Sequence, residues 1–168
     1  MRRLIALFGA IALTASLTGS SLAAVPRSSF TGDFDLLPDG GGPAVGHITA
    51  ELFEPTERRL VPGAYDFKGV PGNQIRESHS VIGSTQFWYD PGNLGGSNVA
   101  FAEGAECIYY GPGDTFCHEI AVMFIDVLDP SHSDQVAFGN RDPDTGEWAF
   151  DWWFWVGKGD FVLKLAGS

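Results

Sequence analysis

Turn-forming residues interrupt this chain at short intervals, and that spacing limits its fold more than any other feature. Pro, Gly, Asn and Asp cluster at residues 62–63, 71–73, 91–93, 111–113 and 142–146. The runs between them are short, apolar or alternating, and none keeps helical periodicity over the length of a typical helix. Short strands separated by frequent turns are typical of antiparallel sandwiches and barrels. The sequence therefore predicts an all-β fold, an antiparallel β-sandwich or β-barrel of about eight or nine strands.

The expected strands follow from these runs and from the apolar alternation within them. They are residues 45–54, 64–68, 80–89, 98–103, 106–110, 115–128, 135–138, 147–156 and 161–165.

The first 23 residues have the pattern of an export signal. Arg2 and Arg3 precede an apolar run over residues 4–17, and small residues lead to Ala23. We expect cleavage between Ala23 and Ala24. The apolar run is short for a membrane span, although a retained anchor is the alternative. We therefore expect a secreted, extracellular protein that does not insert into a membrane.

The remaining 145 residues are enough for one domain. Residues 24–43 contain three prolines and the run Gly40-Gly41-Gly42, and they are expected as a flexible leader. Residues 44–168 are expected as a single all-β domain.

The chain is strongly acidic. Its net charge of −11 becomes −13 when Arg2 and Arg3 are removed with the signal. An acidic surface disfavours nucleic acid and anionic membranes as partners. Cation binding is compatible with this charge, but solubility is its commoner reason.

The two cysteines, Cys107 and Cys117, predict a structural disulfide, because both follow the export signal. They flank Gly111-Pro112-Gly113, and a hairpin centred on Pro112 places them opposite each other as a non-hydrogen-bonded pair. Closing so short a loop stabilises a fold by roughly 2–3 kcal/mol. The same register places Glu106 opposite His118, which we interpret as a surface pair.

The segment WAFDWWFWVG, residues 148–157, holds four of the five tryptophans. With a two-residue turn at Lys158-Gly159, strand alternation predicts Trp148 and Trp152 in the core. It predicts Trp153 and Trp155 on a mixed face with Asp151 and Lys164. These four residues are the candidate ligand-binding residues, and the alternative is that the Lys164 stem covers Trp153 in a cation–π contact.

No motif predicts a catalytic, cofactor or metal site. There is no nucleophile elbow, phosphate loop or dinucleotide fingerprint, and the four histidines lie singly, without zinc-ligand spacing. Residues 140–147 are rich in oxygen donors, but their glycine is one place late for an EF-hand, so an ordinary turn is favoured over a calcium loop. We expect no cofactor.

The middle of the chain resembles a class of small secreted bacterial all-β domains, found alone or behind adhesin-like and protease modules. The resemblance covers residues 46–165 and rests on Gly46-His47-Ile48, residues 98–105, 124–129 and 134–138, and the closing hairpin. It implies an extracellular β-sandwich or barrel without established chemistry. The tryptophan-rich end and the Cys107–Cys117 bridge depart from the pattern.

The function expected from the sequence is non-enzymatic binding of an extracellular partner, such as carbohydrate or a surface protein. The rival is a β-barrel ligand carrier or a cyclase- or isomerase-like enzyme with an apolar cavity. In that rival, Phe87, Tyr89, Tyr109 and Phe124 line the cavity, with His118 or Glu119 at its mouth. A structural module of a cell-surface assembly is the third possibility.

Overall fold

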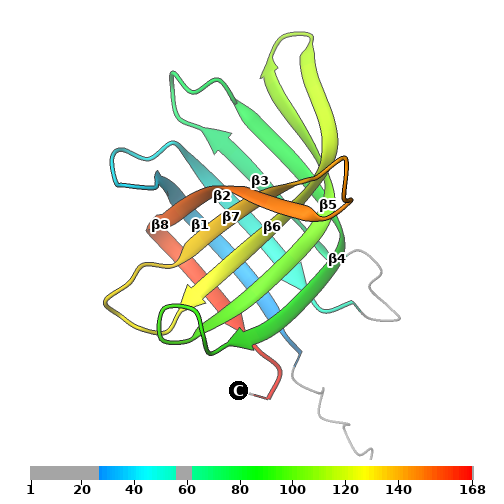
Figure 1. Ribbon diagram of the computed structural model, residues 1–168. Coiled ribbons are helices and arrows are strands. Elements are labelled where there is room, and N and C mark those ends of the chain that lie inside the picture. Colours follow the sequence, from blue (N-terminus) through cyan, green and yellow to red (C-terminus); the bar gives the residue numbers. More distant parts are fainter. Residues whose placement is uncertain (1–26, 56–61, 168) are drawn as a thin grey trace, which may run out of the picture.

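The computed structural model describes residues 27–55 and 62–167, so the expected export signal lies outside the described residues. The described residues form eight antiparallel strands that wind into one closed barrel (Figure 1). The strands are β1 (Ser29–Pro38), β2 (Gly46–Phe53), β3 (Gly63–Gly69), β4 (Glu77–Asp90), β5 (Ser97–Gly111), β6 (Asp114–Val127), β7 (Gln135–Arg141) and β8 (Trp148–Lys164).

Each strand pairs with its neighbours in sequence, and β1 also pairs with β8. This last pairing decides between the two predicted architectures, because it leaves one continuous sheet closed on itself. The all-β prediction is confirmed, and the fold is a barrel.

The prediction of a flexible leader over residues 24–43 is wrong where β1 lies. Phe30, Phe34 and Leu36 are buried in the core, and the residues between them alternate outward. Burial of these three side chains in the core, with the backbone of β1 paired to both β2 and β8, outweighs the cost of ordering a segment between prolines. The alternating pattern was present in the sequence, but the flanking Pro and Gly residues concealed it.

Two pairs of predicted short strands are single long strands. Residues 98–103 and 106–110 both belong to β5, and residues 147–156 and 161–165 both belong to β8. The predicted turn at Lys158-Gly159 is therefore wrong. Gly159 has a φ of 140° within β8, and a Cβ there would overlap the carbonyl oxygen of Asp33 on β1. This glycine allows close approach of two strands, where the sequence pattern indicated a turn.

The barrel interior is filled with aromatic rings around Phe124. Its ring stacks on Phe30 at 4.2 Å between centroids and meets the rings of Phe34, Tyr65 and Phe161 at 6.5 Å each. The other buried members of this core are Leu36, Ile48, Ala50, Leu52, Ile82, Ala100, Ala102, Ile120, Val122, Val136, Phe138 and Leu163.

The β5–β6 hairpin projects beyond the rest of the barrel (Figure 1). β6 pairs with β5 along nearly its whole length, but it pairs with β7 only from Ala121 to Ile125. Residues 114–120 are therefore held by a described strand on one edge only. Arg141, at the end of β7, reaches Glu119 on this hairpin with an Nε–Oε2 distance of 3.0 Å.

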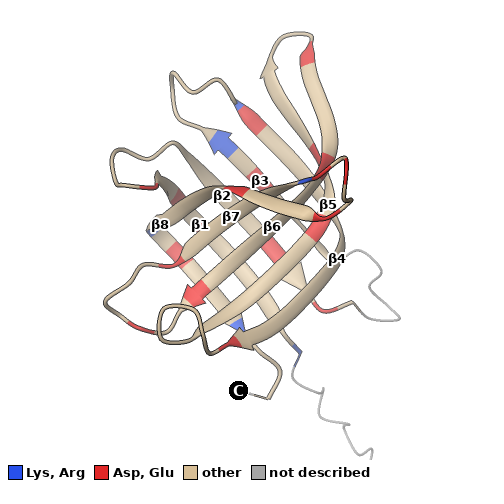
Figure 2. Ribbon diagram, in the orientation of Figure 1, with Lys and Arg blue, Asp and Glu red and all other residues tan. Residues whose placement is uncertain are grey.

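Acidic side chains are spread over the strands and loops, and basic ones are few (Figure 2). Among the described residues, no helix is long and apolar enough to cross a membrane.

Candidate functional site

A bulge in β8 decides which way its tryptophans face. Phe138 of β7 pairs with Trp152, and the next residue, Gly139, pairs with Phe150, so Asp151 is the extra residue. An extra residue shifts the alternation of side chains by one position. The residues of β8 before Asp151 therefore lie on the opposite face from the one that regular alternation would give them.

Trp148 lies on the outer face, and its predicted place in the core is wrong. Its indole N–H donates to Glu103 Oε1, and the Arg141 guanidinium lies 4.6 Å from its ring centroid. Both partners are on the outside of the barrel. Arg141 and Trp148 thus form a cation–π pair, and among the described residues no such contact joins Lys164 and Trp153.

Trp152 is also wrongly predicted as core. It lies opposite Phe138 and so shares the inward face, but it is 52% exposed. None of the described tryptophans is fully buried.

Trp153 and Trp155 lie on the outer face, together with Trp148 and Phe150. Trp153 is 41% exposed, and its indole N–H donates to the Phe150 carbonyl oxygen at 3.1 Å. Trp155 is half-buried and donates to Asp39 Oδ1 at 3.3 Å. The ring of Trp153 is thus held in place while much of its surface stays open.

Asp151 and Lys164, the other two predicted ligand-binding residues, do not form one site with Trp153 and Trp155. Asp151 is exposed at the bulge, two positions from Trp153. Lys164 pairs with Ser29 at the opposite end of β8, about 35 Å along the strand from Trp153. Lys164 is therefore not part of a site with Trp153.

Trp153 forms one wall of a groove of about 470 Å³ on the outer face. Trp88 of β4, which is 38% exposed, lines the same groove. Val99, Met123 and Ile125 also line it, and Asp90 and Asn93 add polar groups. Trp153 also lines a smaller hollow of about 160 Å³ with Trp155, Gln135 and Asp39.

Sequence reasoning missed Trp88 because its place depends on strands far away in the sequence. A register shift between Ile82 and Ser84 places Trp88 opposite Val99, and Val99 is opposite Ile125. Opposed residues share a face, so the row runs across three strands toward β8. No local feature of the sequence marked Trp88, whose immediate neighbours are Phe87 and Tyr89.

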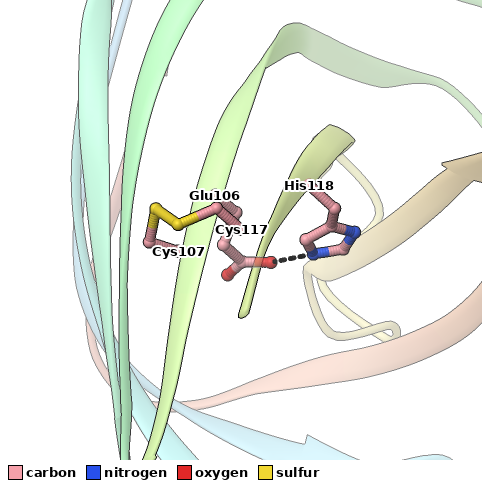
Figure 3. Close-up of a disulfide and its surroundings, with 4 residues drawn as sticks. All are labelled: Glu106, Cys107, Cys117 and His118. Carbon is pink, nitrogen blue, oxygen red and sulfur yellow. Dashed lines mark hydrogen bonds and ion pairs between the residues drawn. A yellow bond between two sulfur atoms is a disulfide. The ribbon is translucent and has the colours of Figure 1, made fainter. Parts of the chain in front are cut away.

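A second group of polar side chains lies inside the barrel, where β5 and β6 project. Glu106 Oε2 is 3.3 Å from His118 Nε2, and Ser78 Oγ donates to Glu106 Oε1 at 2.5 Å. The side chains of Glu106 and His118 are only 8% and 19% exposed, so their interpretation as a surface pair is wrong. The pairing itself is confirmed (Figure 3).

Two hydroxyl groups beside this pair are buried without a hydrogen-bond partner among the described residues. They belong to Tyr65, which is 1% exposed, and Ser80, which is 0% exposed. Tyr65 is opposite Ser80, and Ser80 is opposite Glu106, so all three face inward in one row. Burial raises the pKa of Tyr65 well above its usual value, and the negative charge of Glu106 raises that pKa further. Tyr65 therefore stays a neutral donor at physiological pH.

The residues predicted to line an apolar cavity lie in separate places. Phe124 is in the centre of the core, and the partly buried Phe87 packs against that core. Tyr89 is 50% exposed, and Tyr109 lines a hollow on the outer face. Glu119 points outward to Arg141, so His118 alone of the two predicted mouth residues faces the interior.

The predicted disulfide joins Cys107 and Cys117, with Cα atoms 4.0 Å apart. It lies on the opposite face of the hairpin from Glu106 and His118 (Figure 3). Cys107 lines an outer hollow of about 700 Å³ together with His47 and His79.

His47 is held between two carboxylates, with Nδ1 3.0 Å from Asp35 and Nε2 2.8 Å from Asp33. Hydrogen bonding to Asp35, and then to Asp33, raises the pKa of His47 although burial opposes it. Within residues 27–55 and 62–167, no group of three or more His, Cys, Asp or Glu is placed to hold a metal ion. Of residues 140–147, the first two end β7, and the others connect it to β8 through a turn in which Asp142 Oδ1 accepts the N–H groups of Asp144 and Thr145.

No protein-family model, curated protein or solved structure matches the chain. Two places in the fold combine exposed or polar side chains in a way that suits a ligand: the outer groove between Trp88 and Trp153, and the inward polar row ending at His118.

Proposed function

We propose that this protein is a secreted barrel that binds neutral polysaccharide in the outer groove between Trp88 and Trp153. The observation that carries the proposal is the pair of half-exposed indole rings that line one groove from two distant strands. Their rings are too exposed to serve mainly as core, and exposed aromatic surface marks interaction sites.

The chemistry of the groove favours a sugar chain over a purely apolar ligand. Val99 and Ile125, both 3% exposed, lie beneath the surface, and Met123 is half-buried beside them. Asp90 and Asn93 line the same groove and offer acceptors and donors to hydroxyl groups. Sugar rings combine apolar faces with hydroxyl edges. The apolar faces would stack on the indole rings, and the hydroxyl groups would bond to Asp90 and Asn93.

The orientation of Trp153 supports binding by a preformed surface. Its indole N–H is already bonded to the Phe150 carbonyl, so stacking on its face needs no change of that bond. The smaller hollow with Trp155 adjoins the same ring and provides room for a further sugar unit. The net charge of −11 disfavours acidic polysaccharides, which limits the proposal to neutral ones.

The test is retention on insoluble neutral polysaccharides, with cellulose, chitin and starch as probes. Trp88→Ala and Trp153→Ala are each expected to weaken binding about 30-fold, the effect of a 2 kcal/mol contact residue. Tyr89→Ala is the matched control, because Tyr89 is adjacent to Trp88, 50% exposed and on the other face of β4.

Retention that falls in both tryptophan variants but not in the Tyr89 variant supports the groove. No retention of the wild-type protein on any of the three polysaccharides contradicts the proposal and favours a surface-protein partner or a structural module. Equal loss in all three variants contradicts the assignment to this face.

A further inference from the structure

The inward polar row at the projecting end of the barrel has features that packing alone does not explain. A carboxylate that is almost fully buried normally has its acceptor sites filled by donors from the protein. Glu106 has two such neighbours, the Ser78 hydroxyl and the His118 imidazole. Two further hydroxyls, of Tyr65 and Ser80, lie in the same row and have no partner among the described residues.

His118 connects this buried row to solvent. Its side chain is 19% exposed, while that of Glu106 behind it is 8% exposed. Donation of Nε2–H to Glu106 leaves the lone pair on Nδ1, so the partnered carboxylate sets the tautomer of the ring. A histidine whose outer nitrogen is free to accept a proton, with a carboxylate behind its inner nitrogen, is the arrangement of a general base.

The surroundings of His118 are apolar on the exposed side. The ring of Phe116 lies 5.2 Å from the imidazole between centroids, and Phe116 is 54% exposed. Phe116 lies opposite Ile108 and so faces inward, as His118 does. Residues 114–120 are paired on one edge only, which leaves this side of the barrel end open.

We propose that Glu106 and His118 form an acid–base pair that moves a proton within a small, apolar molecule bearing a carbonyl group. His118 is the catalytic residue and Glu106 positions it. The substrate carries a C=C bond beside the carbon that neighbours the carbonyl. His118 Nδ1 removes a proton from the carbon between the two groups, and the electron pair of that C–H bond moves to form a dienolate. The same imidazolium returns the proton to the far carbon of the C=C bond, so the double bond shifts into conjugation with the carbonyl and no oxidant or reductant is needed.

The buried hydroxyls fit this chemistry. Glu106, anchored by Ser78, stabilises the imidazolium that forms during the reaction. The hydroxyls of Tyr65 and Ser80 have no hydrogen-bond partner among the described residues, so they offer donors to one more oxygen atom, of a water molecule or of the ligand. This site does not depend on the outer groove: Trp88 and Trp153 lie on the other face of the sheet.

The test uses the whole secreted protein and 5-nitrobenzisoxazole, a flat apolar probe of general bases. A base removes the ring C–H proton, that electron pair completes a nitrile, and the N–O bond breaks to release a coloured phenolate. The imidazolium then gives its proton to water, so the probe needs no co-reactant. Activity of the wild-type protein above that of free imidazole at equal concentration is the first expected result.

His118→Asn is expected to lower kcat about 100-fold, the usual worth of a general base. Glu106→Gln is expected to lower kcat at unchanged KM, because it keeps the packing but removes the charge behind the ring. Phe116→Ala removes a side chain that is 54% exposed, and it is expected to raise KM. His79→Asn is the matched control, since His79 is 2.5 Å from Asp66 in a similar pair but is 62% exposed on the outer face.

Each other outcome overturns the proposal. Wild-type activity no greater than that of imidazole shows that the pair is not a base for apolar molecules. Equal losses in His118→Asn and His79→Asn show reaction at any surface histidine. If His118→Asn does not fold, unchanged KM in Phe116→Ala excludes binding at this end. Polysaccharide retention is measured separately, so failure of either proposal leaves the other standing.

Discussion

Removing the disulfide should lower stability without opening the barrel. The bridge spans 10 positions of sequence, and for a loop of that length the chain-entropy relation gives about 2.7 kcal/mol. Cys107 and Cys117 are both exposed, so replacing them with the nearly isosteric serine leaves no cavity in the core. We therefore expect Cys107→Ser with Cys117→Ser to lower the free energy of unfolding by about 2.7 kcal/mol and to retain the native fold.

The measurement is denaturant unfolding at fixed pH, with the wild-type protein in reductant as the matched control. Hydrogen exchange adds local information, because residues 114–120 have no second strand to hold them once the bridge is gone. Their amides should lose more protection than those of β1 and β2, which are paired on both sides. A loss above 5 kcal/mol, or unfolding of the serine variant, would refute this reasoning, because the bridge would then hold the barrel closed. A loss below 1 kcal/mol would show that the hairpin persists in the unfolded chain.

Two further predictions concern the core and the histidine on the outer face. Phe124→Ala should lower the free energy of unfolding by about 3–5 kcal/mol, since its ring is 0% exposed and in contact with four others; a loss below 1 kcal/mol in a denaturant melt would contradict the packed interior. His47→Gln should destabilise the protein in acid and not in alkali. The folded-state pKa of His47 is raised above its usual 6.5, so its contribution is complete below about pH 6.5 and disappears as pH rises through the raised value. Unfolding curves at about pH 5.5 and about pH 8.5 test this sign, and an equal effect at both would refute the assignment to the Asp33 and Asp35 contacts.

The local signals of the sequence predicted much of this fold correctly. Turn residues and alternation located strands near β2, β3, β4, β6 and β7. Spacing around Pro112 predicted the Cys107–Cys117 bridge and the opposition of Glu106 and His118, because a short hairpin fixes its own register. These features depend on residues near one another in the chain.

The errors arose where distant strands decide the outcome. Gly159 was interpreted as a turn residue, but β1 approaches it so closely that only glycine fits. β1 itself was missed because what makes it a strand is pairing with β2 and with β8, more than 110 residues away. The alternation of β1 was present in the local sequence, but the strands that pair with it were not evident there.

The tryptophans show the same division. The sequence by itself determined an all-β chain with a stapled hairpin, and it pointed to Trp153 as a candidate contact. Only the tertiary structure decided that an extra residue at Asp151 turns Trp148 outward, and that Trp88 of β4 joins Trp153 across a groove. It also decided that Glu106 and His118 face the interior. Alternation tells which residues share a face of a strand, but the partners of that strand and its bulges decide which face is covered.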